Sequence, residues 1–214
     1  METTIEQLTK SWRLSPELHE LRAGASESDF EDFNRKSGWK LPDEWQALYR
    51  ISNGAYLVEG NVMLYPLFGE ELSILDASSF HRSAEWPVPD QLRIAGDNGA
   101  GDPFGLWLSS AQTGAPPIVS IGAIFEPKCM SVAGSSLLPF LRARTAYYLM
   151  LCDGPSVALD ALEVPENLRS AESDDALWAA IVAWADPTRP RVSDDPYTAE
   201  LDVKGIESAI KHAA

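Results

Sequence analysis

The residues best suited to chemistry gather between positions 94 and 108, where the sequence reads IAGDNGAGDPFGLWL. Asp97, Asn98 and Asp102 supply side-chain oxygens, and the glycines allow backbone angles that a side chain would forbid. Two apolar runs flank this segment, which is typical of two strands joined by a tight connection. Three interpretations fit: a glycine-rich phosphate cradle, a calcium loop, and a turn whose Asp and Asn side chains cap backbone amides.

The spacing excludes the phosphate cradle and disfavours calcium. The glycines at 99, 101 and 105 lie two and then four residues apart, which breaks the Gly-x-Gly-x-x-Gly pattern, and no Gly-Lys-Ser/Thr ending follows. The oxygen-bearing side chains lack the alternating spacing of an EF-hand and its closing glutamate. We therefore favour the capped turn. Because strand-joining loops are exposed, Asp97, Asn98 and Asp102 are also our candidates for contact with a protein partner.

No other group of residues has the spacing of a catalytic or metal site. His19, His81 and His212 are scattered along the chain, and Cys129 and Cys152 form no Cys-x-x-Cys pair. The Gly-x-Ser-x-Gly elbow of a nucleophilic serine is missing. Adjacent carboxylates occur, but an acidic protein carries such pairs on its solvated faces. The sequence thus predicts no enzyme, no metal site and no cofactor.

The charge balance is strongly acidic, with 32 Asp and Glu against 17 Lys and Arg and a net charge of −15. Phosphate binding needs a cationic surface, so direct binding of nucleic acid is disfavoured, whereas basic partners are attracted. Two cysteines are too few for a secreted disulfide scaffold, and we expect both to be reduced. With no signal-peptide pattern and no membrane-spanning apolar run, the sequence predicts a soluble cytoplasmic protein.

Hydrophobic periodicity predicts the elements that position these residues. Helical patterns come first, and they are listed here by range: 3–22 in two pieces divided at Ser15-Pro16, a short helix after Ser26, and 42–52. Strand patterns follow at 55–59, 62–67, 92–96, 105–109, 118–121 and 124–125. A helix capped by Ser135 or Ser136 then runs to about Leu149. Helices, then consecutive strands, then a helix indicate an α+β domain with one antiparallel-rich sheet.

The last third of the chain has a different character. Residues 151–214 hold thirteen acidic and five basic residues, which gives a net charge of −8. Helices are predicted over 174–185 and 206–212. Trp178 and Trp184 are expected to pack against the main domain. We accordingly divide the chain into three parts: an N-terminal helical segment 1–25, an α+β domain 26–154 and an acidic C-terminal helical extension 155–214.

An ordered set of short motifs resembles the SUKH superfamily. Leu41-Pro42 opens a helix containing Trp45, Leu48 and Tyr49, which ends at Asn53-Gly54-Ala55. The other matching motifs are Leu64-Tyr65-Pro66-Leu67, the Gly-Asp-rich pair 94–106, Pro117-Ile118-Val119, Ser131-Val132-Ala133 and Ser136-Leu137-Leu138-Pro139-Phe140-Leu141. The resemblance covers about residues 26–150. Pro103 within the Gly-Asp segment departs from the pattern, and the extension after residue 155 lies outside it.

The resemblance implies an α+β fold with one mixed or antiparallel sheet and helices packed on it. Most bacterial members resemble immunity proteins, which bind a cognate polymorphic toxin, often a nuclease or nucleotide-modifying domain, in the cytoplasm of the producing cell. Fungal members instead regulate cell-wall synthesis through protein contacts. We therefore expect a toxin-neutralising protein that covers a basic toxin surface with acidic positions on the exposed sheet face and the extension. The alternatives are a regulatory scaffold and a small-molecule binder or enzyme using the 96–105 loop.

Overall fold

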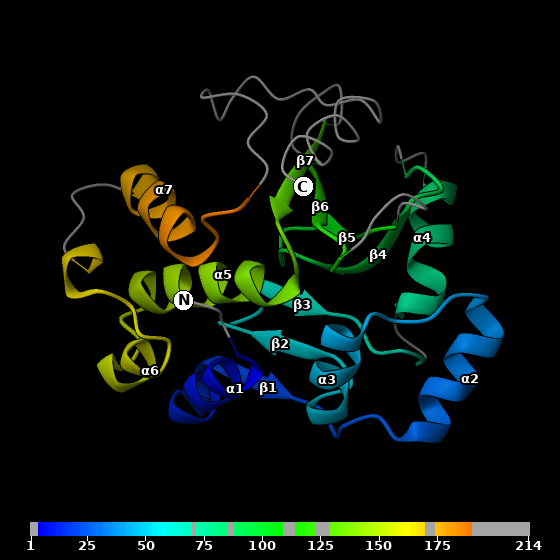
Figure 1. The fold of residues 1–214 in the computed structure, drawn as a ribbon, viewed down its shortest axis with the longest axis horizontal. Coiled ribbons are helices and arrows are strands. Elements are labelled where there is room, and N and C mark those ends of the chain that lie inside the picture. The colour runs from blue at the N-terminus through cyan, green and yellow to red at the C-terminus, as the bar shows by residue number, and fades with distance from the viewer. Residues whose placement is uncertain are drawn as a thin grey trace.

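The computed structural model describes residues 4–69, 72–84, 88–108, 114–122, 129–169 and 174–189. Its elements, in chain order, are α1 (Ile5–Leu14), η1 (Pro16–Leu18), β1 (His19–Leu21), α2 (Glu27–Ser37), α3 (Asp43–Ile51), β2 (Ala55–Leu57), β3 (Val62–Leu64), α4 (Ile74–Ser83), β4 (Leu92–Asp97), β5 (Pro103–Trp107), β6 (Ile118–Gly122), β7 (Cys129–Gly134), α5 (Leu137–Leu151), α6 (Ser156–Ala161), η2 (Glu166–Leu168) and α7 (Asp174–Ala185) (Figure 1). The strand expected at 124–125 and the helix expected at 206–212 lie outside the described residues.

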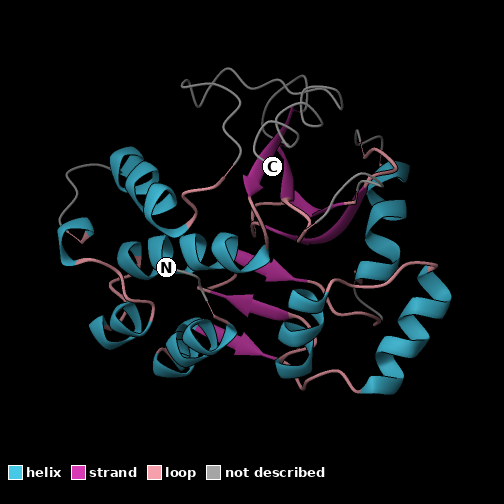
Figure 2. Cartoon of the chain, viewed as in Figure 1, coloured by secondary structure: helices cyan, strands magenta, loops and turns pink. Residues whose placement is uncertain are grey.

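The strands form one seven-stranded sheet in the order β1-β2-β3-β4-β5-β6-β7, and every neighbouring pair is antiparallel. Each strand therefore pairs with the strand that follows it in the chain, even where helices lie between β1 and β2 and between β3 and β4. Helices flank this meander in Figure 2. The predicted α+β class with an antiparallel-rich sheet is confirmed. None of the helices in the described residues is long and apolar enough to cross a membrane.

Residues 15–22 depart from the expected second helical piece. Ser15-Pro16 begins only a single 3-10 turn, and His19–Leu21 then extends as the edge strand β1, paired with β2. Two further bonds hold it there: Glu59 N–H donates to the Leu18 carbonyl at 2.9 Å, and Val58 N–H donates to His19 Nδ1 at 3.2 Å. Pairing with residues far along the chain outweighs the local helical preference here.

Helix α5 packs against four other helices and one strand of the sheet. It contacts α1, α3, α6, α7 and β7, and Phe140 and Leu141 on it are buried. Its first turn is held by Glu44 of α3, whose carboxylate accepts the N–H groups of Leu137 and Leu138 at 3.1 and 2.9 Å and the Ser136 hydroxyl at 3.2 Å. Ser136 occupies the expected cap position, but its side chain makes no capping bond to the helix.

The described part of the C-terminal extension packs against α5. The Arg142 guanidinium, which is 2% exposed, donates to the Leu162 carbonyl through Nε at 3.2 Å and Nη2 at 2.8 Å, and it lies 4.0 Å from the centre of the Trp184 ring. Trp178 meets Tyr147 edge-on at 5.1 Å. The two tryptophans therefore pack on the main domain as expected, and α7 lies beside α5 in Figure 1.

We expect Glu44→Ala to destabilise the protein by about 2–4 kcal/mol, because three donors at the start of α5 lose their acceptor. Urea unfolding followed by circular dichroism measures this loss. Glu31→Ala, an exposed glutamate of α2, is the matched control and should change the free energy of unfolding by no more than about 0.5 kcal/mol. Equal effects of the two substitutions would contradict this role for Glu44.

We expect the stability of the protein to depend on pH because of the buried His19. Burial lowers the pKa of His19 from 6.5 to about 4, so the unfolded chain binds a proton in this window that the folded chain does not. Stability should therefore fall as the pH drops from about 6.5 towards 4, by as much as roughly 3 kcal/mol. His19→Gln should flatten the free energy of unfolding between pH 6.5 and 4.5 in urea titrations. An unchanged slope in this variant would refute the assignment.

Candidate functional site on the open face of the sheet

The Gly-Asp-rich segment forms the turn between β4 and β5, and its polar side chains build that turn. Asp97 Oδ1 accepts the Gly99 N–H at 2.6 Å. Asn98 Oδ1 accepts the N–H groups of Ala100 and Asp102 at 3.0 and 2.9 Å, and Asn98 Nδ2 donates to Asp102 Oδ2 at 3.0 Å. Capping of backbone amides, which the sequence favoured, is therefore the geometry observed.

The same turn separates the three candidate residues. Asp97 lines a hollow of about 280 Å³, whereas Asn98 and Asp102 line a different hollow of about 200 Å³. The second hollow also receives the half-buried Arg144 of α5 and the hydroxyls of Ser120 and Ser131, which lie 3.1 Å apart on β6 and β7. The structure thus does not bring the predicted residues to a single site, and their role in partner binding stays a prediction.

Burial shapes the electrostatics of this second hollow. The pKa of Arg144 is lowered, chiefly by burial, although Tyr148 and, less strongly, Asp102 favour its charged form. Its guanidinium lies 4.8 Å from the centre of the Trp178 ring, so the extension helps to hold it. A cation held between an aromatic ring and a nearby carboxylate is already largely balanced. We therefore interpret this hollow as a packed polar contact between α5, the β4–β5 turn and strands β6 and β7.

A row of side chains crosses four strands on the sheet face that carries Asp97. Glu20 pairs with Tyr56, Tyr56 with Met63, and Met63 with Asp97, so the four lie side by side from β1 to β4. Tyr56 and Met63 sit between buried neighbours in their strands and remain partly exposed, and Glu20 is exposed. Directly paired residues point to the same face of a sheet. We call this surface, defined by Glu20, Tyr56, Met63 and Asp97, the open face.

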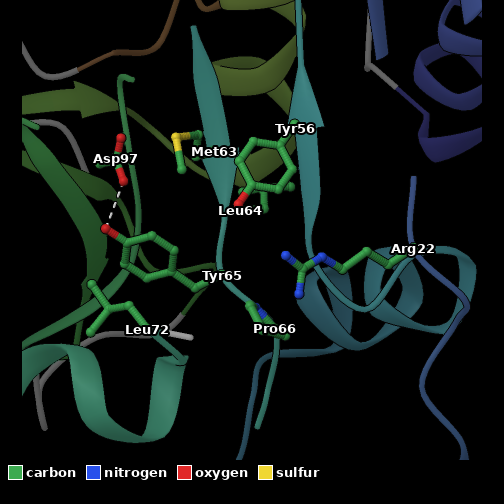
Figure 3. Close-up of a pocket in the computed structure, with 8 residues that line it drawn as sticks. All are labelled: Arg22, Tyr56, Met63, Leu64, Tyr65, Pro66, Leu72 and Asp97. Carbon is green, nitrogen blue, oxygen red and sulfur yellow. Dashed lines mark hydrogen bonds between the residues drawn. The ribbon is translucent and has the colours of Figure 1, made fainter. Parts of the chain in front are cut away.

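The hollow of about 280 Å³ is sunk into the open face. Its lining residues are Arg22, Tyr56, Met63, Leu64, Tyr65, Pro66, Leu72 and Asp97. Figure 3 shows Asp97 and Arg22 on opposite sides of it, with the tyrosine rings and the thioether between them. The Arg22 guanidinium lies 5.6 Å from the centre of the Tyr56 ring. The hollow therefore has an aromatic and apolar lining with a charge at each side.

Asp97 is the most constrained group in this hollow. It is 8% exposed, and its Oδ2 accepts the Tyr65 hydroxyl at 2.7 Å. Tyr65 is itself fixed, because the buried Tyr49 hydroxyl donates to its carbonyl at 2.5 Å. Burial, reinforced by the bond to Asp97, raises the pKa of Tyr65, so this hydroxyl is a permanent donor at physiological pH. The carboxylate is thus oriented by neutral donors on both of its oxygens.

The residue types that line this hollow are those of a binding surface. Among the described residues, no three His, Cys, Asp or Glu side chains approach closely enough to hold a metal ion. Tyr, Met and Arg, by contrast, are enriched in protein–protein interfaces. Sequence reasoning found Asp97 but missed Glu20, Tyr56 and Met63. The outward positions of two short strands were visible in the sequence, but only the pairing register shows that they adjoin Asp97.

We expect Tyr65→Phe to destabilise the protein by about 1.5–3 kcal/mol, because a buried carboxylate loses a hydrogen bond. Tyr56→Phe is the matched control on the same face, since its hydroxyl has no hydrogen-bond partner among the described residues, and it should change stability by less than about 0.5 kcal/mol. Urea unfolding of both variants measures the difference. A Tyr65→Phe protein as stable as the wild type would show that the bond contributes nothing.

Comparison with known protein families identifies the family of this chain. A family model described as the SMI1 / KNR4 family (SUKH-1) matches residues 24–143, which run from just before α2 into α5. Tyr56, Met63 and Asp97 lie inside the matched part, whereas β1 with Glu20 precedes it. No curated protein matches the chain. Because the matched residues make up more than half of the chain, the protein belongs to the SMI1 / KNR4 family (SUKH-1) of the SUKH superfamily.

Proposed function

We propose that this protein is a non-enzymatic immunity protein that binds and neutralises a cognate polymorphic toxin in the cytoplasm of the cell that makes both. The family supports an immunity protein or an SMI1/KNR4-like regulator, and both functions consist of binding another protein. The carrying observation is this membership together with a net charge of −15. A nuclease or nucleotide-modifying toxin needs a basic surface for its substrate, and an acidic protein can cover that surface.

The open face is the surface that we assign to this contact. It combines exposed carboxylate charge at Glu20 with the partly exposed side chains of Tyr56 and Met63 and with a hollow between them and Asp97. A pocket beside an aromatic anchor is where interface binding energy concentrates. The net negative charge of the protein then steers a basic partner into place. The same face would serve an SMI1/KNR4-like scaffold, for which the partner would be a cellular protein.

Co-expression with the toxin encoded beside this gene tests the proposal. We expect relief of toxicity and a complex that survives purification. The association rate constant should fall about tenfold or more when the salt concentration is raised from well below to above the physiological level. Stopped-flow mixing with a catalytically inactive toxin measures the rate. Neither a complex nor relief of toxicity would overturn the proposal. If no toxin gene lies beside this one and the protein captures housekeeping proteins in pull-downs, the regulatory scaffold is favoured instead.

A further inference from the structure

The buried carboxylate of Asp97 lacks a cationic partner in the part of the chain that the structure describes. Its oxygens accept from a tyrosine hydroxyl at 2.7 Å and a backbone amide at 2.6 Å, and none of the ion pairs that join two described residues involves Asp97. Removing a carboxylate from water is costly unless a charge compensates for it. A carboxylate also has room for about four hydrogen bonds. Asp97 therefore retains both the charge and the acceptor capacity to bind a cation.

The hollow in front of this carboxylate has room for a long side chain. Its volume is about 280 Å³, and Tyr56, Met63 and Leu72 provide apolar walls before the charged end is reached at Asp97. Lysine and arginine combine an aliphatic stem with a cationic head, so their stems lie along apolar surface while the head finds its partner. A bare metal ion fits less well, because Ca²⁺ and Mg²⁺ require six or more oxygens and Asp97 is the only carboxylate among the described residues of the lining.

We propose that this hollow receives one lysine or arginine side chain of the protein partner, whose head group pairs with the Asp97 carboxylate while its stem packs between Tyr56, Met63 and Leu72. This inference rests on the proposed function, because it names the anchor by which the toxin would be held. The net charge of −15 favours a basic partner, and Glu20 adds negative charge at the other end of the same row of side chains. The Arg22 guanidinium lies near the Tyr56 ring, at the opposite side of the hollow from Asp97.

The location of the pair decides what it should contribute. A charge pair formed inside a desolvated pocket resists dissociation, whereas rim charges mainly change the association rate. Loss of the Asp97 charge should therefore increase the dissociation rate constant and leave the salt dependence of association nearly unchanged. Loss of the Glu20 charge, at an exposed position, should have the opposite signature. The two kinetic constants thus separate an anchor in the hollow from general electrostatic attraction.

The first experiment compares Asp97→Asn with Asp43→Asn, which makes the same change at an exposed position of α3 outside the hollow. With a catalytically inactive form of the neighbouring toxin, Asp97→Asn should weaken binding about 30-fold or more through faster dissociation, and Asp43→Asn should stay within about threefold of the wild type. Met63→Lys provides a second variant, because Met63 pairs directly with Asp97 and an amine placed there would occupy the hollow and block the partner. Circular dichroism and thermal unfolding confirm that each variant is folded.

The second experiment needs no toxin. Butylguanidinium, a side-chain mimic, is titrated into labelled protein while the Met63 methyl group and the Gly99 amide are followed by NMR. Both signals should shift in the wild type and stay unchanged in Asp97→Asn, and butyrate at the same concentration should leave them in place. Absence of shifts at these two groups, or identical shifts in Asp97→Asn, would overturn the inference.

The outcomes keep the inference and the proposed function apart. If the toxin binds the wild type and Asp97→Asn equally well, the anchor is wrong while the immunity function stands. If the toxin fails to bind the wild type but butylguanidinium shifts the signals of the hollow, the proposed function is wrong and the cation site stands. Binding of the toxin by Met63→Lys with wild-type affinity would also exclude the hollow as the anchor site.

Discussion

The carboxylate of Glu44 at the start of α5 is the interaction on which the arrangement of the helices depends. It joins α3 to α5 across more than ninety residues of chain and satisfies amides that begin the helix. Negative charge at a helix N-terminus is favourable, and here it acts in a half-buried position where burial raises the pKa of Glu44. Since α1, α6 and α7 all pack on α5, this contact helps to fix where these three helices lie.

The open face exists because the helices do not cover both faces of the sheet completely. In β2 and β3 the buried positions alternate with Tyr56 and Met63, so one face is used for the core and the other is left partly exposed. An antiparallel sheet tolerates such an arrangement because its two faces are independent. Further along, α4 packs against β4, and the hollow lies where Leu72 leads into that helix. The proposed binding surface is thus the part of the sheet face that the helices leave uncovered.

The features that could be predicted from the sequence are those that depend on residues close together in the chain. The α3 helix and the capped turn were predictable, because Trp45 and Leu48 repeat at helical spacing and Asn98 bonds only to residues within four positions of itself. Strand β1 and the role of Glu44 were not. Both depend on partners more than thirty residues away, and an acid in the first turn of α3 reads locally as a dipole partner for its own helix.

The candidate site also combines a feature that nearby residues determine with features that strand pairing determines. Asp97 was identifiable because a Gly-Asp turn is a local pattern, but its neighbours on the open face come from register alone. Its carboxylate serves the fold through Gly99 and Tyr65, and it also lines the hollow. Bonds that orient the carboxylate before a partner arrives reduce the ordering cost of binding. Asp97 can thus act in recognition because the turn and Tyr65 already hold it in place.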